Sequence, residues 1–338
     1  MNRSALPALL LAAGLAGLAG CSASADPGQD SGGTPGQTPG GTPASDNSGY
    51  PLTVTNCGTA VTLTAPPERI LTIKSTALET VLALGLGSRV IGSAFTDGPV
   101  PAALADGAAV PPSISDAAPS REAVLELEPD FIYAGWESNL SAETAGDRPF
   151  LASLGIGSYV SPAACRAEGA RPGKLDFEDV FADITEAGAV FGAPEAAAAL
   201  VAGQRELLAG VEPSGQGRTA FWYSSGRDTP YSGAGLGAPQ LILDRLGLKN
   251  IAADVPEAWA PLSWETVVAA NPDVIVLIDS DWNSAAAKKE LLASHPATAA
   301  MDAVINERYL VLPFAAGEAG VRNAEAVADL AGQLADLP

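Results

Sequence analysis

From residue 69 onward, short apolar runs alternate with longer segments in which apolar residues recur every three or four positions. Short runs are typical of buried strands, and the periodic segments are typical of amphipathic helices. In the first half the strands are RILTI (69–73), RVIGS (89–93), FIYAG (131–135) and SYV (158–160), and helices are predicted at 77–85 and 149–155. Before them, PLTVT and VTL flank NCGT, which predicts a hairpin with Cys57 at its tip. Strands that alternate with helices predict a parallel α/β lobe.

A second series of the same kind begins near residue 216. Its strands are RTAFWYS, DVIVLID and YLVLP, and helices are predicted at 238–247 and 323–334. Between the two series, helical periodicity is strong in 175–192 and again from Pro194 to Gly210, with proline at a first helical position and glycine at a C-terminal cap. We therefore expect a helix over 194–215 to join the halves. An ordinary surface helix of one lobe is the alternative.

One pattern occurs twice. The segment SREAVLELEPDFIY begins at Ser120, and SWETVVAANPDVIV begins at Ser263, with serine, glutamate, valine, proline, aspartate and isoleucine at matching positions. In each copy serine is a good N-cap, the acid suits the positive end of a helix, and Pro-Asp forces a turn before a buried strand. The repetition predicts two similar lobes. The predicted fold is α/β, with two Rossmann-like parallel-sheet lobes joined by a single long helix.

The N-terminal region reads as a secretion signal followed by a tether. Residues 1–20 hold Arg3 and an apolar run too short to span a bilayer convincingly, and the run ends in Leu18-Ala19-Gly20-Cys21. This ending is similar to a bacterial lipobox, in which Cys21 would carry lipid. The alternative is an ordinary signal with a chance cysteine. Residues 21–49 are rich in Gly, Pro, Thr and Ser and predict a disordered linker. The expected location is the outer face of a bacterial cell membrane, with membrane contact through the lipid only.

The charge and the cysteines narrow the class of protein further. The chain has 39 acidic and 18 basic residues, which makes nucleic acid an unsuitable partner. Once Cys21 is assigned to lipid, Cys57 and Cys165 remain as a pair in an oxidising setting, so a disulfide is expected. A metal site is the alternative for this pair, but the only histidine is His295 and the spacing fits no zinc pattern. We expect no metal and no cofactor.

The order of several motifs resembles a known family. These motifs are PPERILTI, the two S-x-E-x-V…P-D units, the Ala-rich long helix, and GAGLGAPQLILDRLG followed by KNIA. Together they resemble the substrate-binding proteins of ABC importers in the helical-backbone group, which capture ferric siderophores, haem and cobalamin. The resemblance implies an N-terminal lobe (50–193), a connecting helix (194–215), a C-terminal lobe (216–338), a ligand cleft between the lobes, and no enzymatic activity.

The resemblance also gives the repeated glutamates a role. It implies that Glu122 and Glu265 face outward, one from each lobe, and pair with arginines of a dimeric permease. The alternative is simple stabilisation of the helix dipole, worth roughly 0.3 to 1 kcal/mol for each residue. More narrowly, GWESNLSAETAGDRPFLASLG, YVSPAACRAEG, WYSSGRDTPYSGAG and PFAAGEAGVRN look like an actinobacterial branch that binds a precursor of a deazaflavin coenzyme.

Candidate ligand-binding residues follow from the rule that ligands gather beyond the carboxyl ends of parallel strands. Aromatic faces at these positions suit flat conjugated ligands, and core packing is the alternative for any one of them. An anionic ligand would use the few cations at loop ends, although Arg322 could instead pair with Glu318 or Glu325. The predicted set is Lys74, Ser75, Trp136, Glu137, Ser138, Ser161, Tyr223, Ser224, Ser225, Tyr231, Trp259, Trp282, Phe314 and Arg322.

Two other functions fit parts of the pattern. An exported α/β hydrolase would have to use His295 in its triad, and no G-x-S-x-G segment follows a strand. A metal-ion receptor of similar architecture would normally need several histidines in its cleft. A binding protein that captures a conjugated or chelated small molecule, such as a deazaflavin coenzyme precursor, a ferric siderophore or a corrinoid, is therefore the expected function.

Overall fold

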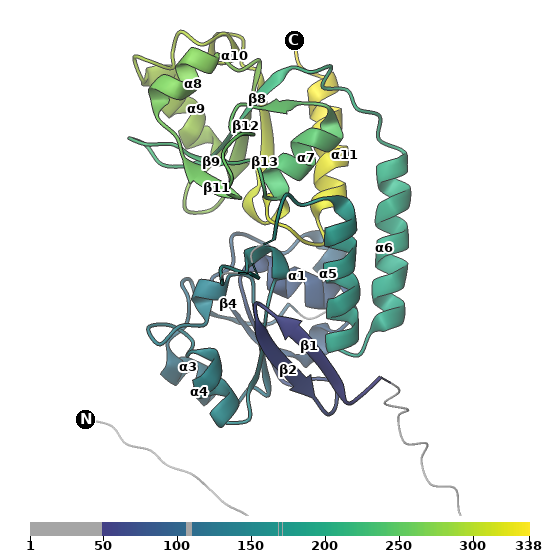
Figure 1. Cartoon of the computed structure of the whole chain (residues 1–338). Coiled ribbons are helices and arrows are strands. Elements are labelled where there is room, and N and C mark those ends of the chain that lie inside the picture. The colour runs from purple at the N-terminus through teal and green to yellow at the C-terminus, as the bar shows by residue number, and fades with distance from the viewer. Residues whose placement is uncertain (1–48, 106–109, 168, 171) are drawn as a thin grey trace, which may run out of the picture. The chain divides into compact units, whose positions relative to one another are not determined.

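The computed structural model describes residues 49–105, 110–167, 169–170 and 172–338. The predicted signal peptide, Cys21 and almost all of the predicted linker lie outside these residues. The described residues from 50 onward form two α/β lobes, the first drawn in purple to teal and the second in green to yellow (Figure 1). No helix among the described residues has the length and apolar character needed to cross a bilayer.

The first lobe is built on a parallel sheet in the order β5-β4-β3-β6-β7. Its strands are β3 (Ile70–Ile73), β4 (Val90–Ala94), β5 (Ser113–Ser115), β6 (Phe131–Ala134) and β7 (Gly157–Val160). Its helices are α1 (Ser75–Ala83), α2 (Ala102–Ala105), α3 (Arg121–Glu126) and α4 (Arg148–Ser153), with 3-10 turns η1 (Gly87–Arg89), η2 (Glu137–Asn139) and η3 (Pro162–Ala164). The predicted hairpin is present as β1 (Leu52–Asn56) and β2 (Thr59–Leu63).

The second lobe has a mixed sheet in the order β11-β9-β8-β12-β13, with β10 paired to β8. Its strands are β8 (Thr219–Ser225), β9 (Tyr231–Gly233), β10 (Lys249–Asn250), β11 (Trp259–Pro261), β12 (Val274–Asp279) and β13 (Tyr309–Pro313). Its helices are α7 (Ala238–Leu246), α8 (Trp264–Ala270), α9 (Ala285–Ser294), α10 (Asp302–Ile305) and α11 (Asn323–Ala335), and η4 (Phe314–Gly317) follows β13.

The three predicted strands of the second sheet, β8, β12 and β13, are parallel, and two strands that were not predicted run antiparallel. Strand β9 runs antiparallel to β8, and β11 runs antiparallel to β9. The β8–β9 connection is only residues 226–230, which is too short for the helical crossover that parallel neighbours need. Gly226 makes this turn possible, because its φ is +84° and a Cβ there would lie 2.0 Å from the carbonyl oxygen of Thr229.

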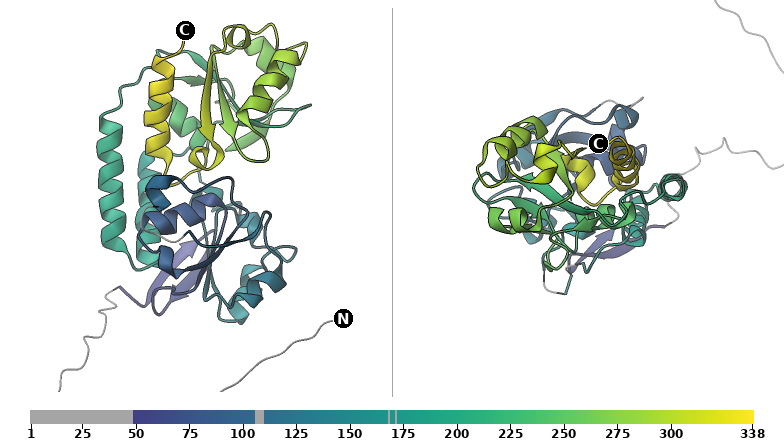
Figure 2. Two further views of the ribbon diagram at one scale, coloured as in Figure 1. Left: turned by 180° about the vertical axis from the view of Figure 1, so that it is seen from behind. Right: turned by 90° about the horizontal axis from the view of Figure 1, so that it is seen from above.

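Two helices lie at one side of the molecule. Helix α5 (Phe177–Val190) lies beside the first lobe and reaches the junction of the lobes, and α6 (Pro194–Ala209) runs along both lobes (Figures 1 and 2). Helix α6 begins at Pro194 and is capped at Gly210, as predicted, but it ends before the expected residue 215. Its buried Ala197 belongs to the apolar core of the first lobe, and its buried Leu208 belongs to that of the second. The helix is therefore a shared part of two cores, which explains how it joins them.

The repeated unit has a clear local structure in both lobes. Ser120 accepts a hydrogen bond from the Ala123 N–H at 3.3 Å, and Ser263 accepts one from the Thr266 N–H at 3.1 Å. These serines are N-caps of α3 and α8, as predicted.

The aspartate of each Pro-Asp pair ties its own strand to the neighbouring strand. Asp130 accepts hydrogen bonds from the backbone of Glu68 and Arg69, just before β3. Asp273 accepts from the backbone N–H of Thr219 at 2.7 Å, at the start of β8. The equivalent aspartates of the two repeated units therefore fix the start of the central strand in each sheet.

Candidate ligand-binding cleft

A cleft of about 720 Å³ lies where the carboxyl ends of strands from both sheets meet. The first lobe contributes the residues after β6 and β7, and the second contributes the ends of β8 and β9, the loop before β11 and the turn after β13. This volume falls within the range typical of small-molecule sites. The cleft lies where the strand-end rule predicts a ligand site.

Half of the predicted ligand-binding residues line this cleft. They are Trp136, Ser161, Ser224, Ser225, Tyr231, Trp259 and Phe314. Five of them follow or end a strand, which is the feature that selected them from the sequence, whereas Tyr231 and Trp259 are the first residues of β9 and β11. The structure brings these residues together, and ligand contact by them stays a prediction.

The other predicted residues do not line the cleft. Lys74, Ser75 and Tyr223 are buried, with relative exposures of 1%, 4% and 1%. The Tyr223 hydroxyl donates to the carbonyl of Gly226, and its ring packs in the core of the second lobe. Tyr223 turns into the core because a strand presents alternate residues to opposite faces, which the sequence rule does not distinguish. Lys74 and Ser75 stand at the start of α1, where the positive φ of Lys74 sets the direction of its side chain.

The remaining four predicted residues lie near the cleft and make other contacts. The Glu137 carboxylate accepts a hydrogen bond from the Arg166 backbone, and Ser138 lies beside it in η2. Trp282 is 55% exposed and meets the Phe314 ring edge-on at 5.6 Å. Arg322 pairs with Glu79 of α1 at 3.4 Å, and not with Glu318 or Glu325 as the alternative held.

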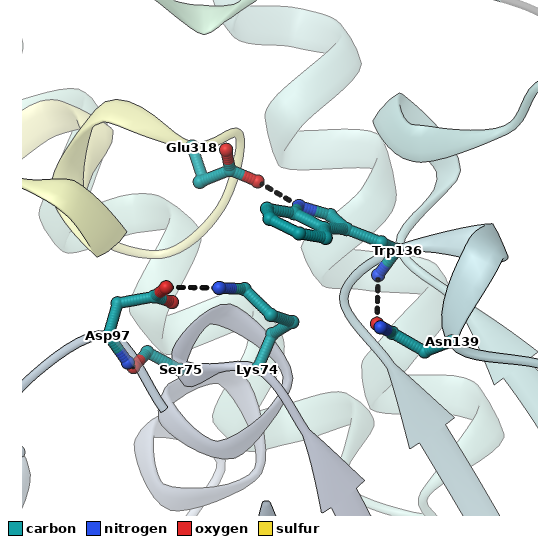
Figure 3. A network of polar contacts seen from close by, with 6 residues as sticks. All are labelled: Lys74, Ser75, Asp97, Trp136, Asn139 and Glu318. Atoms are coloured by element: carbon teal, nitrogen blue, oxygen red, sulfur yellow. Dashed lines mark hydrogen bonds and ion pairs between the residues drawn. The ribbon is translucent and has the colours of Figure 1, made fainter. Parts of the chain in front are cut away.

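A buried cation supports the floor of the cleft. The Lys74 ammonium forms an ion pair with Asp97, and both side chains are almost fully buried. It also lies 4.3 Å from the centre of the Phe95 ring, 4.1 Å from that of Trp136 and 5.0 Å from that of Phe314. Figure 3 shows the ion pair of Lys74 and Asp97 on one side of the Trp136 indole and Glu318 on the other. Cation–π attraction of this kind strengthens when the cation is desolvated.

The backbone at Lys74 is strained in order to reach this position. Lys74 has φ +81°, in the region that side chains other than glycine rarely adopt. Gly135, at the end of β6, closes against it, because a Cβ there would lie 2.6 Å from both the Lys74 Cβ and the Thr76 hydroxyl. The strand end and the start of α1 therefore meet only because residue 135 has no side chain.

Aromatic rings from both lobes gather around Phe314. Trp259 stacks on it with ring centres 6.4 Å apart and planes at 6°, and Trp136 of the first lobe meets it at 6.3 Å with planes at 65°. Rings that are already packed lose little conformational freedom when a ligand arrives. This part of the cleft therefore offers a preorganised apolar surface for a flat or conjugated molecule.

The predicted disulfide joins the hairpin tip to the cleft wall. Cys57 and Cys165 are bonded, with Cα atoms 5.0 Å apart across 108 residues of sequence. Cys165, Ala163, Ala164 and Arg166 all line the cleft. The bond therefore fixes a segment that carries no strand or long helix of its own and that forms one side of the binding space.

Four lining residues with polar side chains were missed by the sequence rule. They are Thr76, Arg166, Glu257 and Glu318. Glu318 follows the end of β13 by five residues, so a wider window after that strand would have included it. The other three depend on which way a helix start or a long loop turns, and the sequence carries no comparable signal for that. The Thr76 hydroxyl is buried and has no hydrogen-bond partner in the part of the chain that the structure describes.

Burial changes the acidity of carboxyl groups at the junction of the lobes. Glu318 accepts a hydrogen bond from the Trp136 indole N–H at 2.7 Å, yet burial raises the pKa of Glu318 to about 7. Burial also raises the pKa of Glu79 to about 7, against the opposing effect of Arg322. The pKa of Asp97 is raised by burial as well, although Lys74 opposes the shift. Within the described ranges, no group of three or more His, Cys, Asp or Glu side chains is arranged to hold a metal ion.

Two α/β lobes that share a helix and enclose an aromatic cleft define a two-lobed solute-binding protein. Comparison with protein families agrees with this class, because the periplasmic binding protein family model matches residues 70–316. The chain belongs to the periplasmic binding protein family. Its family and fold neighbours are binding proteins, and the family acts outside the cytoplasm and delivers ligands to ABC permeases.

Individual relatives show the same class. A cobalamin-binding protein of Halobacterium salinarum is 29% identical over 238 residues, which cover 67% of this chain and 58% of that protein. A solved structure from an ABC-type Fe3+-hydroxamate transport system of Saccharomonospora viridis has a TM-score of 0.72 at 27% identity, covering 84% of this chain and 99% of that one. A periplasmic binding protein of Veillonella parvula has a TM-score of 0.70 at 25% identity, covering 83% and 96%.

Replacing Lys74 by methionine should destabilise the protein by about 3 to 5 kcal/mol, because Asp97 would keep a buried charge without a partner. Urea unfolding followed by circular dichroism measures the loss. The double variant Lys74→Met/Asp97→Asn removes both charges and should recover at least half of it. If K74M unfolds at the same urea concentration as the unchanged protein, the buried pair does not carry the stabilisation that we assign to it.

Stability should fall as the pH rises from about 5 to about 7.5. Burial raises the pKa of Glu79, Asp183 and Glu318 to about 7 in the folded protein, whereas ordinary carboxyl groups release their protons near pH 4. Between these values the folded state binds more protons than the unfolded state, so raising the pH favours unfolding. The melting temperature, measured at constant ionic strength, should drop by several degrees, and Glu79→Gln should make the slope shallower. A melting temperature that is constant or rises over this interval would contradict the assignment.

Proposed function

We propose that the protein is a lipid-anchored substrate-binding protein of an ABC importer. In this proposal it captures a conjugated or chelated small molecule between its lobes and presents it to a permease dimer. The observation that carries the proposal is the aromatic cleft of about 720 Å³ at the strand ends of both lobes. A deazaflavin coenzyme precursor, a ferric siderophore and a corrinoid are the proposed ligand classes, because packed rings suit conjugated or chelated bodies.

Similar proteins support this choice of ligands. The Halobacterium relative is named for cobalamin, and the Saccharomonospora structure belongs to a hydroxamate transport system. The matched region spans only 58% of the Halobacterium protein. Cobalamin is therefore only a proposed ligand for this chain. The predicted lipid on Cys21 and the tether after it would hold the lobes near the permease.

The two repeated glutamates are proposed as the docking contacts. Glu122 lies in the first turn of α3 and Glu265 in the first turn of α8, and both are exposed. Both helices lie on the side of their lobe away from α6 (Figure 1). Hydrogen bonds from the helix backbone and the capping serine lower the pKa of each, so both carboxylates are charged at neutral pH and are available to arginines.

A chelate or conjugated ligand should raise the melting temperature of the purified protein. A ligand whose free concentration is 100 times its dissociation constant adds about 2.7 kcal/mol to the free energy of unfolding. The panel is cyanocobalamin, ferrioxamine B, haemin and a riboflavin-like deazaflavin, each confirmed by native mass spectrometry as a complex with one ligand per chain. The variant Trp259→Ala should weaken the complex. If no member of the panel produces a shift or a complex, the proposed function is wrong for these ligand classes.

The double variant Glu122→Ala/Glu265→Ala should abolish uptake in cells that carry the cognate permease while ligand affinity stays unchanged. Loss of two exposed charges removes the permease contact and leaves the cleft intact. The matched control is Glu126→Ala/Glu290→Ala, which removes the same charge from exposed positions on α3 and α9 and should transport normally. Normal uptake by the first variant, or a loss of ligand affinity, would argue against docking through these glutamates.

A further inference from the structure

Glu318 links the second lobe to the first at the edge of the cleft. It follows η4 in the second lobe, and its Oε2 atom accepts a hydrogen bond from the Trp136 indole of the first lobe at 2.7 Å. The carboxyl is half-buried and lines the cleft. Figure 3 shows it on the opposite side of the indole from Lys74. The group is therefore held in place by a residue that also lines the cleft.

The second oxygen of Glu318 is available to a ligand. In the described part of the chain, Oε1 takes part in no hydrogen bond, and it is not among the buried polar atoms that lack one. Glu318 also forms no salt bridge there. A half-buried carboxyl without a cation in contact keeps its capacity to accept hydrogen bonds and to attract positive charge.

The nearby cations are already used by other carboxylates. The Lys74 ammonium is paired with Asp97 and is shielded from the cleft by the Trp136 ring. Arg322 is paired with Glu79. Two of the three cations that the sequence offers for an anionic ligand, Lys74 and Arg322, are therefore committed to internal pairs. The third, Arg227, is exposed and does not line the cleft. An anion beside Glu318 would meet its carboxyl and neither of the two paired cations. Arg166 also lines the cleft, but it lies in the segment after β7 on the wall formed by the first lobe.

Aromatic rings line the same cleft as Glu318. Trp136, Trp259 and Phe314 line the same cleft and form the packed aromatic surface described above. A ligand group that reaches Oε1 would leave water and rest against these rings. Such a place favours a cation or an N–H donor attached to a flat or apolar body, because the rings also attract positive charge.

We propose that Glu318 makes this cleft selective for the charge of the ligand. It favours ligands that bring a positively charged or N–H donor group beside a conjugated or chelated body. This inference rests on the proposed function and narrows its ligand classes. Trp136 acts as a positioning residue, because its indole holds one oxygen of the carboxyl and leaves the other for the ligand.

The charged and polar groups that face Glu318 support the same conclusion. Burial raises the pKa of Glu318 to about 7, while the hydrogen bond from Trp136 and the charge of Lys74 lower it and Asp97 raises it further. A cation bound at Oε1 would stabilise the ionised form. Cation binding should therefore release a proton near neutral pH and weaken as the pH falls below about 7.

The test uses two ligand pairs that differ by one positive charge. Ferrioxamine B carries a free ammonium and its N-acetyl derivative does not, and aquacobalamin is cationic where cyanocobalamin is neutral. Dissociation constants are measured by tryptophan fluorescence for the full chain, for Glu318→Gln, and for Glu325→Gln. The last variant removes the same charge from an exposed position on α11 outside the cleft. Circular dichroism checks that each variant is folded.

We expect the unchanged protein to bind the cationic member of at least one pair roughly tenfold more tightly or better, which is the size of a hydrogen bond to a charged group. Glu318→Gln should remove most of this preference and change the affinity for the neutral member by less than about threefold. Glu325→Gln should keep the preference. Lowering the pH from about 8 to about 6 should weaken ferrioxamine B binding in the unchanged protein and not in Glu318→Gln.

The outcomes separate this inference from the proposed function. If members of a pair bind equally, or if Glu318→Gln keeps the preference, Glu318 does not determine ligand charge and the proposed function stands. The same holds if an anionic member of the panel, such as haemin, binds most tightly and Glu318→Gln leaves it unaffected. If neither pair and no other panel member binds, the proposed function fails and the inference fails with it.

Discussion

The cleft depends on one buried charge. The Lys74 ammonium has left water almost completely, and a lone ammonium in that position would cost several kcal/mol. Asp97 offsets part of this cost through the ion pair, and the rings of Phe95, Trp136 and Phe314 offset more. Because Phe314 belongs to the second lobe, the same cation that shapes the first lobe also fixes where the second lobe can lie. The groups beneath the cleft therefore take the place of water around a buried cation.

The contacts between the lobes are of the same kind throughout. Trp136 donates to Glu318, Arg322 pairs with Glu79, and the Gln204 side chain on α6 donates to the backbone of Val321. Each pairs a polar group that would otherwise be costly to bury, so separating the lobes would leave several groups unsatisfied at once. Together with the cores shared by α6, these contacts favour a nearly fixed cleft over one that opens widely. A cleft of this kind gains affinity from preorganisation.

The sequence predicted the elements well and the directions of side chains poorly. Helix α6, the capping serines, the hairpin and the main strands follow from periodicity and from Pro, Gly and Ser positions, all of which are local signals. Lys74 also follows a strand, but its positive φ turns the side chain under the cleft, and its partner Asp97 is 23 residues away. Glu318 and the antiparallel β9 depend on how a turn closes. These features arise from tertiary contacts, which periodicity does not encode.

The residues shared by the two repeated units can be separated by what the fold requires of them. The serines cap helices, and the aspartates fix the start of central strands. Val124 and Val267 are fully buried, as are Ile132 and Ile275, and the prolines begin the turn before each strand. The glutamates remain: they are exposed, and in the described residues neither forms a salt bridge. Helix capping, hydrogen bonding, burial and turn formation therefore explain five of the six identities. The glutamates suit the positive ends of their helices and also leave one exposed charge on each lobe.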